Sequence, residues 1–347
     1  MDSIKKLPLG TFFIKIILTL LVASIIMILL GTSPIEVMQA IFDGAFGRPE
    51  KIVKTMLIFL PISLASLALI ITFSGGLWNI GIEGQIVLGA IGATWIAKSF
   101  FGETLVSPIA QVIVGMSLGA LWGLLCGYLK VKFSVHEIFG GLGLDFVAMG
   151  AIIYLILGPW SKSGIASTSG TEIFPKESWF PTVSNLNIPA LPLIIVSVII
   201  LLLILFLSYS RFGLMLRATG INPSSTNKYK FNSNHYIYLA FILGGAIAGL
   251  AGVFQASVFY HKLVPSISGG YGFLAILVVL ASNRRILPTL LLTFFFSVMI
   301  AGGSQLQLRL NLHSSLISIV LSSMVFFWLI FNSAKIDDLL RRIIRRN

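Results

Sequence analysis

The 347-residue chain contains little charge and almost no cysteine. Only 10% of its residues are charged, whereas 56% are hydrophobic and the mean hydropathy is +0.98. This composition excludes an ordinary soluble domain and predicts an all-α protein that crosses a membrane many times. Cys126 is the single cysteine and lies in an apolar run, so an intrachain disulfide is excluded and redox chemistry is disfavoured.

The sequence also lacks the common motifs of ATP-binding and hydrolytic proteins. It contains no GxxxxGK[ST] phosphate loop, no HExxH and no GxSxG. We therefore expect no catalytic residue, no metal ligand and no cofactor bound by this chain. The four histidines are scattered at the ends of apolar runs, where interfacial positions suit them better than metal coordination: His136, His235, His261 and His313.

Apolar runs of membrane-spanning length occur ten times, and most are close to the ~20 residues that cross a bilayer. We expect spans at 12–30, 54–73, 85–101, 107–128, 137–158, 189–208, 236–259, 271–283, 286–303 and 314–333. No small-residue cleavage site follows the first run, which predicts a retained span. The chain is then one transmembrane domain over 1–347, whose two halves cover 12–158 and 189–333.

The basic residues indicate how the chain is oriented. Its net charge is +12, but the positive side chains fall in short clusters between apolar runs, which disfavours nucleic-acid binding. With a cytoplasmic N-terminus, 16 of the 24 Lys and Arg residues lie on the inner side. We therefore expect a multi-pass protein of the cell membrane with both termini in the cytoplasm. Arg48, Lys51 and Lys54 form an exception on the outer side.

Two long connections and the C-terminal tail lie outside the predicted spans. The outer loop, 159–188, carries Trp160, Trp179 and Phe180, which suit the headgroup level of the membrane or, alternatively, a docking surface for an extracellular partner. The tail, 334–347, predicts a basic amphipathic helix on the lipid of the inner leaflet.

The inner loop, 209–235, is basic and polar. Phe212 to Ala218 is expected to form a short helix that Gly220 and Pro223 end, and 224–230 could form a second. Such a helix could dock into the groove of a soluble partner; the alternative is a solvated loop whose charges only set the topology.

A glycine-rich segment, Ser74 to Gln85, interrupts the apolar pattern between the second and third spans. In lipid, non-helical backbone is tolerated only where protein covers it or water reaches it. An ionisable residue inside the membrane, here Glu83, is a candidate functional residue. The alternative is an ordinary loop with Glu83 in water. The absence of Lys and Arg between Lys54 and Lys98 favours a buried, broken-helix segment.

Other polar and glycine positions extend this picture. Asp145 is the second acid deep in an apolar run, and it could line a polar path with Glu83 or be satisfied by neighbouring helices. A second glycine-rich break, 268–272, opens the eighth span. Five spans on each side of the outer loop would fit inverted five-helix repeats.

Gly245, Gly249 and Gly252 provide a small-residue face on which helices can approach closely.

Four segments together resemble one family. Gly76 to Gln85 resembles the "GLFNIGVEGQ" stretch of permease subunits from nucleoside and simple-sugar ABC importers that work with basic-membrane-protein lipoproteins. Gly213 to Pro223 resembles their coupling loop, "G..LRA.G.NP". Two further segments, 136–145 and 261–273, resemble the family's "NEVI…MLN" pattern and the stretch after the seventh span. These matches occur in order over most of the chain.

The resemblance implies a type II ABC importer permease fold of ten spans. It implies ABC ATPase subunits that bind and hydrolyse ATP with Mg²⁺, a second and non-identical permease subunit, and an extracytoplasmic substrate-binding lipoprotein. The substrate would be a nucleoside or simple sugar that is moved inward. The expected path-lining residues are Trp78, Asn79, Glu83, Gln85 and Asp145. The expected ATPase-coupling residues are Gly213, Arg217, Ala218, Gly220, Asn222 and Pro223.

The chain departs from the family at two places. Asp145 stands where the family has asparagine, and 224–232 is more polar than the usual alanine-rich stretch. Two other classes of function stay open on the residues. An ion-coupled secondary transporter could carry protons on Glu83 and Asp145, and an intramembrane enzyme could use Glu83 on lipid-linked substrates.

Overall fold

The computed structural model describes residues 9–29, 31–162, 169–183, 188–222 and 232–310, with scattered positions between 319 and 330. Within these residues the protein is helical, and extended pairing is limited to isolated bridges such as Val183 with Ile188. The predicted all-α class is therefore confirmed. The chain divides into two compact units, 1–55 with 295–347 and 56–294.

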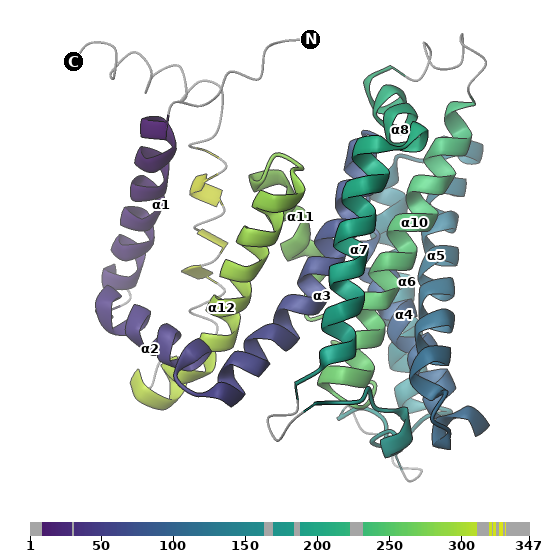
Figure 1. Cartoon of the computed structure of the whole chain (residues 1–347), viewed down its shortest axis with the longest axis horizontal. Coiled ribbons are helices and arrows are strands. Elements are labelled where there is room, and N and C mark those ends of the chain that lie inside the picture. The colour runs from purple at the N-terminus through teal and green to yellow at the C-terminus, as the bar shows by residue number, and fades with distance from the viewer. Residues whose placement is uncertain are drawn as a thin grey trace. The chain divides into compact units, whose positions relative to one another are not determined.

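The unit 56–294 holds most of the helices (Figure 1). Two helices cross the boundary between the units, α3 at Met56 and α12 at Phe294. In chain order the elements are α3 (Pro49–Ser74), α4 (Ile82–Ala97), η1 (Phe100–Glu103), α5 (Ser107–Phe133), α6 (Glu137–Leu157), η2 (Lys176–Ser178), α7 (Ala190–Tyr209), α8 (Arg211–Ile221), α10 (Ser233–Phe254), η3 (Gln255–Phe259), α11 (Tyr271–Ala281) and α12 (Ile286–Leu310).

Most predicted spans coincide with helices. Six helices of the described chain are long and apolar enough to cross a membrane: α3, α5, α6, α7, α10 with the π-helical η3, and α12. The spans predicted at 85–101 and 271–283 form α4 and α11, which have only 16 and 11 residues. The span predicted at 314–333 and the tail at 334–347 lie largely or wholly outside the described residues.

The unit 1–55 with 295–347 contains a helix that the sequence analysis does not predict. After α1 (Leu9–Leu29) the chain turns through 104° into α2 (Pro34–Phe46). Gly44 of α2 packs directly on Gly302 of α12, since a Cβ on Gly44 would lie 2.7 Å from the Gly302 Cα. Asp43 forms an ion pair with Arg309, and Lys51 Nζ donates to the Asp43 carbonyl over 2.9 Å.

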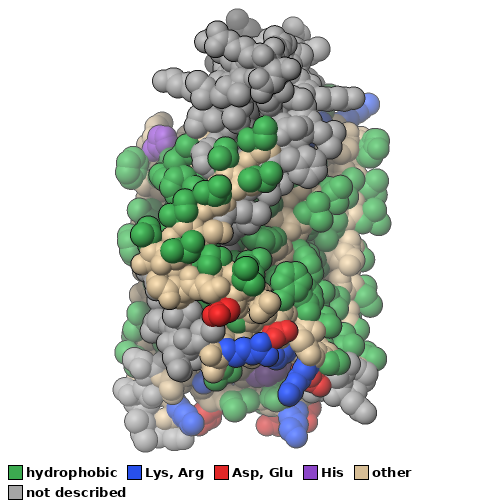
Figure 2. All heavy atoms as spheres, turned by 90° about the vertical axis from the view of Figure 1, so that its left-hand side faces the viewer, with side chains coloured by type: hydrophobic (Ala, Val, Ile, Leu, Met, Phe, Trp, Pro, Cys, Tyr) green, Lys and Arg blue, Asp and Glu red, His purple; other side chains and the backbone are tan. Residues whose placement is uncertain are grey.

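These contacts explain part of the basic cluster that the sequence analysis finds on the outer side. Lys51 has a fixed partner in α2 and is not an isolated positive charge. Figure 2 shows a face on which hydrophobic side chains cover most of the coloured surface, while Lys, Arg, Asp and Glu gather towards its lower end. Apolar surface with most of its charge near one end is typical of a chain that faces lipid.

Three helices form the centre of the larger unit through contacts between glycines. Gly115, Gly119 and Gly123 follow one another at intervals of four along α5 and face Gly245 and Gly249 of α10. A Cβ on Gly119 would lie 2.3 Å from the Gly245 carbonyl oxygen, so the two backbones touch. The predicted close approach at Gly245 and Gly249 is confirmed, whereas the matching glycines of α5 escape the sequence analysis.

The third helix, α4, joins the same contact. A Cβ on Gly89 would lie 2.0 Å from the Gly249 carbonyl oxygen, and one on Gly252 would lie 1.9 Å from that of Ile86. Small residues at this spacing let helices pack closely in lipid, where no hydrophobic force drives them together. The α4, α5 and α10 helices therefore provide a rigid support for the segments that precede α4 and α11.

The outer loop is tied to the connection that follows η3. Phe174 N donates to the His261 carbonyl over 2.8 Å, and Thr171 N donates to that of Leu263 over 2.9 Å. The Trp179 ring stacks on the His261 imidazole with ring centroids 3.8 Å apart. Burial lowers the pKa of His261 from its ordinary 6.5 and favours the neutral ring in this stack.

The described part of this loop and α8 lie at opposite ends of the larger unit, with α8 next to the end of α7 (Figure 1). Opposite ends are what the sequence analysis expects of an outer and an inner loop. The predicted helix over Phe212 to Ala218 is confirmed, but it runs from Arg211 to Ile221. The prediction that Gly220 ends it is wrong, because Gly220 lies within the helix and Asn222 is its C-cap. The second helix predicted at 224–230 lies outside the described residues.

Candidate functional site

The glycine-rich segment between α3 and α4 is a buried interruption of the helical backbone. We name residues 75–81 the α3–α4 joint. Gly76 has φ +69°, a left-handed conformation that favours glycine. Beyond it the exposure alternates, with Leu77 and Asn79 buried and Trp78 40% exposed. The predicted break covered by protein is confirmed, while its depth in a membrane stays a prediction.

Two side-chain amides connect the joint to α4. Asn79 Nδ2 donates to Gln85 Oε1 over 3.1 Å, and Gln85 Nε2 donates back to Asn79 Oδ1 over 3.0 Å. Both side chains are almost fully buried. The reciprocal bonds satisfy two buried polar groups at once and connect the joint with the first turn of α4.

Asp145 holds the beginning of α4. Its Oδ1 accepts a hydrogen bond of 2.7 Å from the Gly84 N–H, one of the N-terminal amides of α4 that have no partner within the helix. Asp145 lies on α6 and is only 2% exposed. Gly84 permits the approach, since a Cβ there would lie 2.7 Å from Trp122 Nε1 and 2.9 Å from Asp145 Oδ1.

Glu83 likewise bonds to the beginning of α11. Its Oε1 accepts a hydrogen bond of 3.0 Å from the Phe273 N–H in the first turn of α11, 190 residues further along the chain. Glu83 is 1% exposed. A Cβ on Gly272 would lie 3.0 Å from the same oxygen, so the carboxylate touches the backbone. The two glycine-rich breaks that the sequence analysis compares are therefore in direct contact.

Two charged residues that are not among the predicted site residues, Glu137 and Arg284, also reach the joint. Glu137 Oε1 accepts from the Trp78 N–H over 3.4 Å, while its Oε2 forms an ion pair with Lys130. Arg284 Nη1 donates to the Phe73 carbonyl over 3.2 Å, at the end of α3. The only sequence signal for these roles is a charge next to an apolar run, which many interfacial residues share.

The C-terminal end of α8 packs against the joint. A Cβ on Gly220 would lie 2.7 Å from the Gly75 carbonyl carbon and 2.8 Å from Gly76 N. Leu216 is fully buried, and its Cδ1 would lie 2.7 Å from a Cβ on Gly75. At the other end of α8, the Ser210 side chain accepts from Gly213 N over 3.1 Å. The predicted coupling helix and the predicted path segment are thus adjacent.

The predicted coupling residues divide between the two faces of α8. Gly213 is buried against the α7 backbone, where a Cβ would lie 2.4 Å from the Leu207 carbonyl oxygen. Arg217 and Asn222 are exposed, and Ala218 is partly buried. Pro223 lies outside the described residues. Positions facing away from the bundle combine positive charge with apolar surface: Arg211, Leu214, Arg217 and Ile221.

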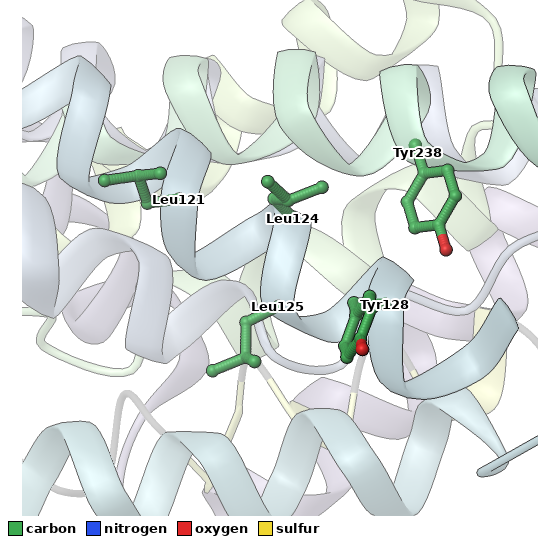
Figure 3. A pocket seen from close by; sticks show the side chains of 5 residues that line it. All are labelled: Leu121, Leu124, Leu125, Tyr128 and Tyr238. Carbon is green, nitrogen blue, oxygen red and sulfur yellow. The ribbon is translucent and has the colours of Figure 1, made fainter. Parts of the chain in front are cut away.

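A surface hollow lies elsewhere in this unit. It has a volume of about 360 Å³ and is lined by Leu121, Leu124, Leu125 and Tyr128 of α5 and Tyr238 of α10 (Figure 3). Its leucine side chains bring no converging polar groups of the kind that orient a sugar or nucleoside. Among the described residues, no group of three His, Cys, Asp or Glu side chains could hold a metal ion.

Comparison with known proteins decides the family. Residues 51–332 match the family described as branched-chain amino acid transport system / permease component. The chain belongs to this family. It is thus a permease, a multi-pass membrane protein whose class is not catalytic, and the predicted ABC permease identity is confirmed.

Individual relatives agree with this membership. The permease is 26% identical over 342 residues to the glucose ABC transporter permease protein TsgB13 of Haloferax volcanii, covering 92% of this chain and 87% of the relative. It is 27% identical over 319 residues to the guanosine ABC transporter permease protein NupP of Bacillus subtilis, covering 90% and 91%. A chain of PsaBC from Streptococcus pneumoniae in complex with Fab shares the fold, with a TM-score of 0.51, 15% identity and coverage of 88% and 99%.

Proposed function

We propose that this permease is the membrane-spanning subunit of an ATP-driven importer that moves a nucleoside or a simple sugar into the cell. The observation that carries the proposal is the chain's similarity, over nine-tenths of its length, to a glucose permease and a guanosine permease of ABC transporters. The four motif segments of the sequence support the same assignment. Glucose and guanosine share a hydroxyl-rich sugar ring, so the proposed substrate class is a sugar or a sugar-bearing base.

The proposed complex contains two permease subunits, which are not identical, and two ABC ATPase subunits. ATP and Mg²⁺ are bound and hydrolysed in the ATPase subunits, in line with the absence of a phosphate loop from this chain. The exposed side of α8 offers Arg217 and Leu214 to the ATPase, a mixture of charge and apolar surface that suits a helix docking in a groove. On this assignment both termini face the cytoplasm.

An extracytoplasmic substrate-binding lipoprotein delivers the substrate at the opposite end. The described part of the outer loop, 169–183, is held there by hydrogen bonds to the His261 and Leu263 carbonyls, which supports it as a surface for such a partner. ATP binding draws the ATPase subunits together, α8 follows, and the path changes from outward to inward access.

Of the five residues predicted to line the path, Trp78 has an exposed side chain. Its indole could stack on a base or a sugar ring. Asn79, Glu83, Gln85 and Asp145 are buried within this subunit and bonded to one another or to helix ends. Direct contact between these four side chains and the substrate stays a prediction.

Uptake by the assembled complex tests the substrate class. The permease would be purified with its partners, reconstituted in liposomes and supplied with labelled guanosine or glucose. We expect uptake of one of the two and competition by unlabelled compounds of the same class. Uptake of neither, by a complex that hydrolyses ATP, would refute the proposed substrate class.

A further inference from the structure

The α3–α4 joint is the meeting point of the coupling helix and the starts of two other helices. We propose that Glu83 and Asp145 are positioning residues that carry a displacement of α8 through the joint to α4 and α11. They do so as hydrogen-bond acceptors, without binding or releasing a proton during transport. This inference rests on the proposed importer function, in which α8 contacts the ATPase.

The first step of the route is a contact between backbones. A Cβ on Gly220 of α8 would lie 2.7 Å from the Gly75 carbonyl carbon, and one on Gly76 would lie 3.0 Å from the Gly220 carbonyl oxygen, so the two backbones are in contact. Leu216 and Thr219, on the same side of α8, are also buried. Close-packed backbone has no flexible side chain that could absorb a movement, so a displacement of this end of α8 must displace the joint.

The second step leads from the joint into α4 and α11. Asp145 fixes the first turn of α4 to α6 through the Gly84 N–H, and Glu83 in that same turn holds the first turn of α11 through the Phe273 N–H. Both carboxylates are nearly inaccessible to water. Removing the Asp145 acceptor would leave the buried Gly84 N–H without this partner, and removing the Glu83 acceptor would do the same to the part-buried Phe273 N–H. Both losses are costly, so the two helix starts are held together.

The chemistry of these bonds requires an oxygen and not a charge. A backbone N–H is satisfied by any well-placed acceptor, and the side-chain carbonyl of Gln or Asn provides one at the position of the carboxylate oxygen. A proton carrier, in contrast, needs a carboxyl group that titrates. The amide variants Glu83→Gln and Asp145→Asn therefore separate the two roles, while Glu83→Ala and Asp145→Ala remove the acceptor.

The decisive experiment measures substrate uptake and ATP hydrolysis together, in the complete complex in liposomes. We expect both amide variants to retain uptake within about twofold and to keep the wild-type pH profile. The alanine variants should co-purify with the ATPase and hydrolyse ATP, but the uptake per ATP should fall about tenfold or more. Loss of uptake in the amide variants, or full coupling in the alanine variants, would overturn the proposal.

Hydrogen exchange gives a readout that needs no substrate. In the membrane-embedded complex the Phe273 amide should be protected in wild type and Glu83→Gln and should exchange at least about tenfold faster in Glu83→Ala. ATP binding to the ATPase should alter this protection in wild type but not in Gly220→Ala. Gly143→Ala is the matched control, because a Cβ at Gly143 meets nothing within 4 Å.

These two measurements distinguish the inference from the proposed function. A wild-type complex that imports neither guanosine nor glucose would contradict the substrate class and leave the exchange result to decide the role of the joint. An ATP-dependent change at Phe273 that persists in Gly220→Ala would contradict the route through the joint, whatever the substrate.

Discussion

Asn79 and Gln85 lie six residues apart, on either side of the start of α4, and bond to each other through both of their amide groups. The ionisable side chains around this pair bond to the ends of helices. Asp145 and Glu83 accept hydrogen bonds from N-terminal amides of α4 and α11, and Arg284 donates to a carbonyl at the C-terminal end of α3. Each of these three side chains thus bonds to the backbone at the end of a helix.

The amide pair should act as one unit. Asn79→Ala leaves the Gln85 amide buried without its partner, so each single substitution should lower the free energy of unfolding by about 1–3 kcal/mol. Adding the second substitution should cost little more, so the coupling energy should be close to the cost of one single substitution, about 1–3 kcal/mol. Thermal unfolding in detergent of the two single variants and the double variant checks this prediction. Strictly additive losses would show that the two side chains act independently.

At this scale the sequence reveals which residues are unusual but not what they contact. Glu83 and Asp145 are recognisable as acids in apolar runs. The partner of Glu83 is a backbone N–H 190 residues away, and no local pattern indicates it. Glu137 and Arg284 look like ordinary interfacial charges, because a residue at a helix boundary has the same sequence context whether it faces water or caps a neighbouring helix.

The helices α4, α5 and α10 owe their contact to glycine. The four-residue spacing of the α5 glycines is visible in the sequence, yet this spacing is also compatible with flexibility or with a lipid-facing groove. The contact with the glycines of α10 shows that these α5 glycines form a helix–helix interface. The sequence predicts the α10 side of this interface, and the α5 side follows once the two helices are paired.

Filling this interface should destabilise the permease strongly. Leucine at Gly119 would overlap the α10 backbone, since even a Cβ lies 2.3 Å from the Gly245 carbonyl oxygen. We expect Gly119→Leu to cost about 1–3 kcal/mol or more, as overpacked interiors do. Gly150→Leu is the control, because that position is open, and it should stay within about 0.5 kcal/mol of wild type. Equal melting temperatures for the two variants would contradict the close contact.

The packing of α8 against α7 offers a second test. Gly213→Asp would push its side chain into the Leu207 carbonyl oxygen, since a Cβ there lies 2.4 Å away. This should displace α8, abolish uptake and weaken co-purification of the ATPase by about tenfold, equivalent to about 1.4 kcal/mol. Asn234→Asp adds the same charge at an exposed position in the first turn of α10 and should preserve both. Normal co-purification and coupled hydrolysis in Gly213→Asp would refute the assignment.

Across the whole chain, hydropathy locates the long spans well, because each is a run of about 20 apolar residues. Hydropathy does not predict a helix that is short and partly polar. The 13-residue α2 contains Glu36 and Asp43 and is too short and polar to be predicted as a span. The spans predicted at 85–101 and 271–283 do form helices, α4 and α11. The side chains that bond to their first turns, Asp145 and Glu83, are distant in sequence from Gly84 and Phe273 respectively, so no local pattern indicates these contacts.

The unit 56–294 thus combines a set of helices packed through glycines, an outer loop whose residues 169–183 bond to the connection after η3, and the helix α8, which contacts the α3–α4 joint. In the larger unit, α8 and the outer loop lie at opposite ends (Figure 1), as a coupling helix and a receptor surface must. This arrangement suits a permease in which energy enters at one end and substrate at the other.

The energy source of uptake tests this account most directly. Liposomes containing the complete complex would be loaded with ATP or left without it, and uptake of labelled guanosine and glucose would be measured with and without an ionophore that collapses ion gradients. The account predicts uptake that requires ATP and persists with the ionophore. Uptake that proceeds without ATP and disappears with the ionophore would contradict it and favour an ion-coupled transporter.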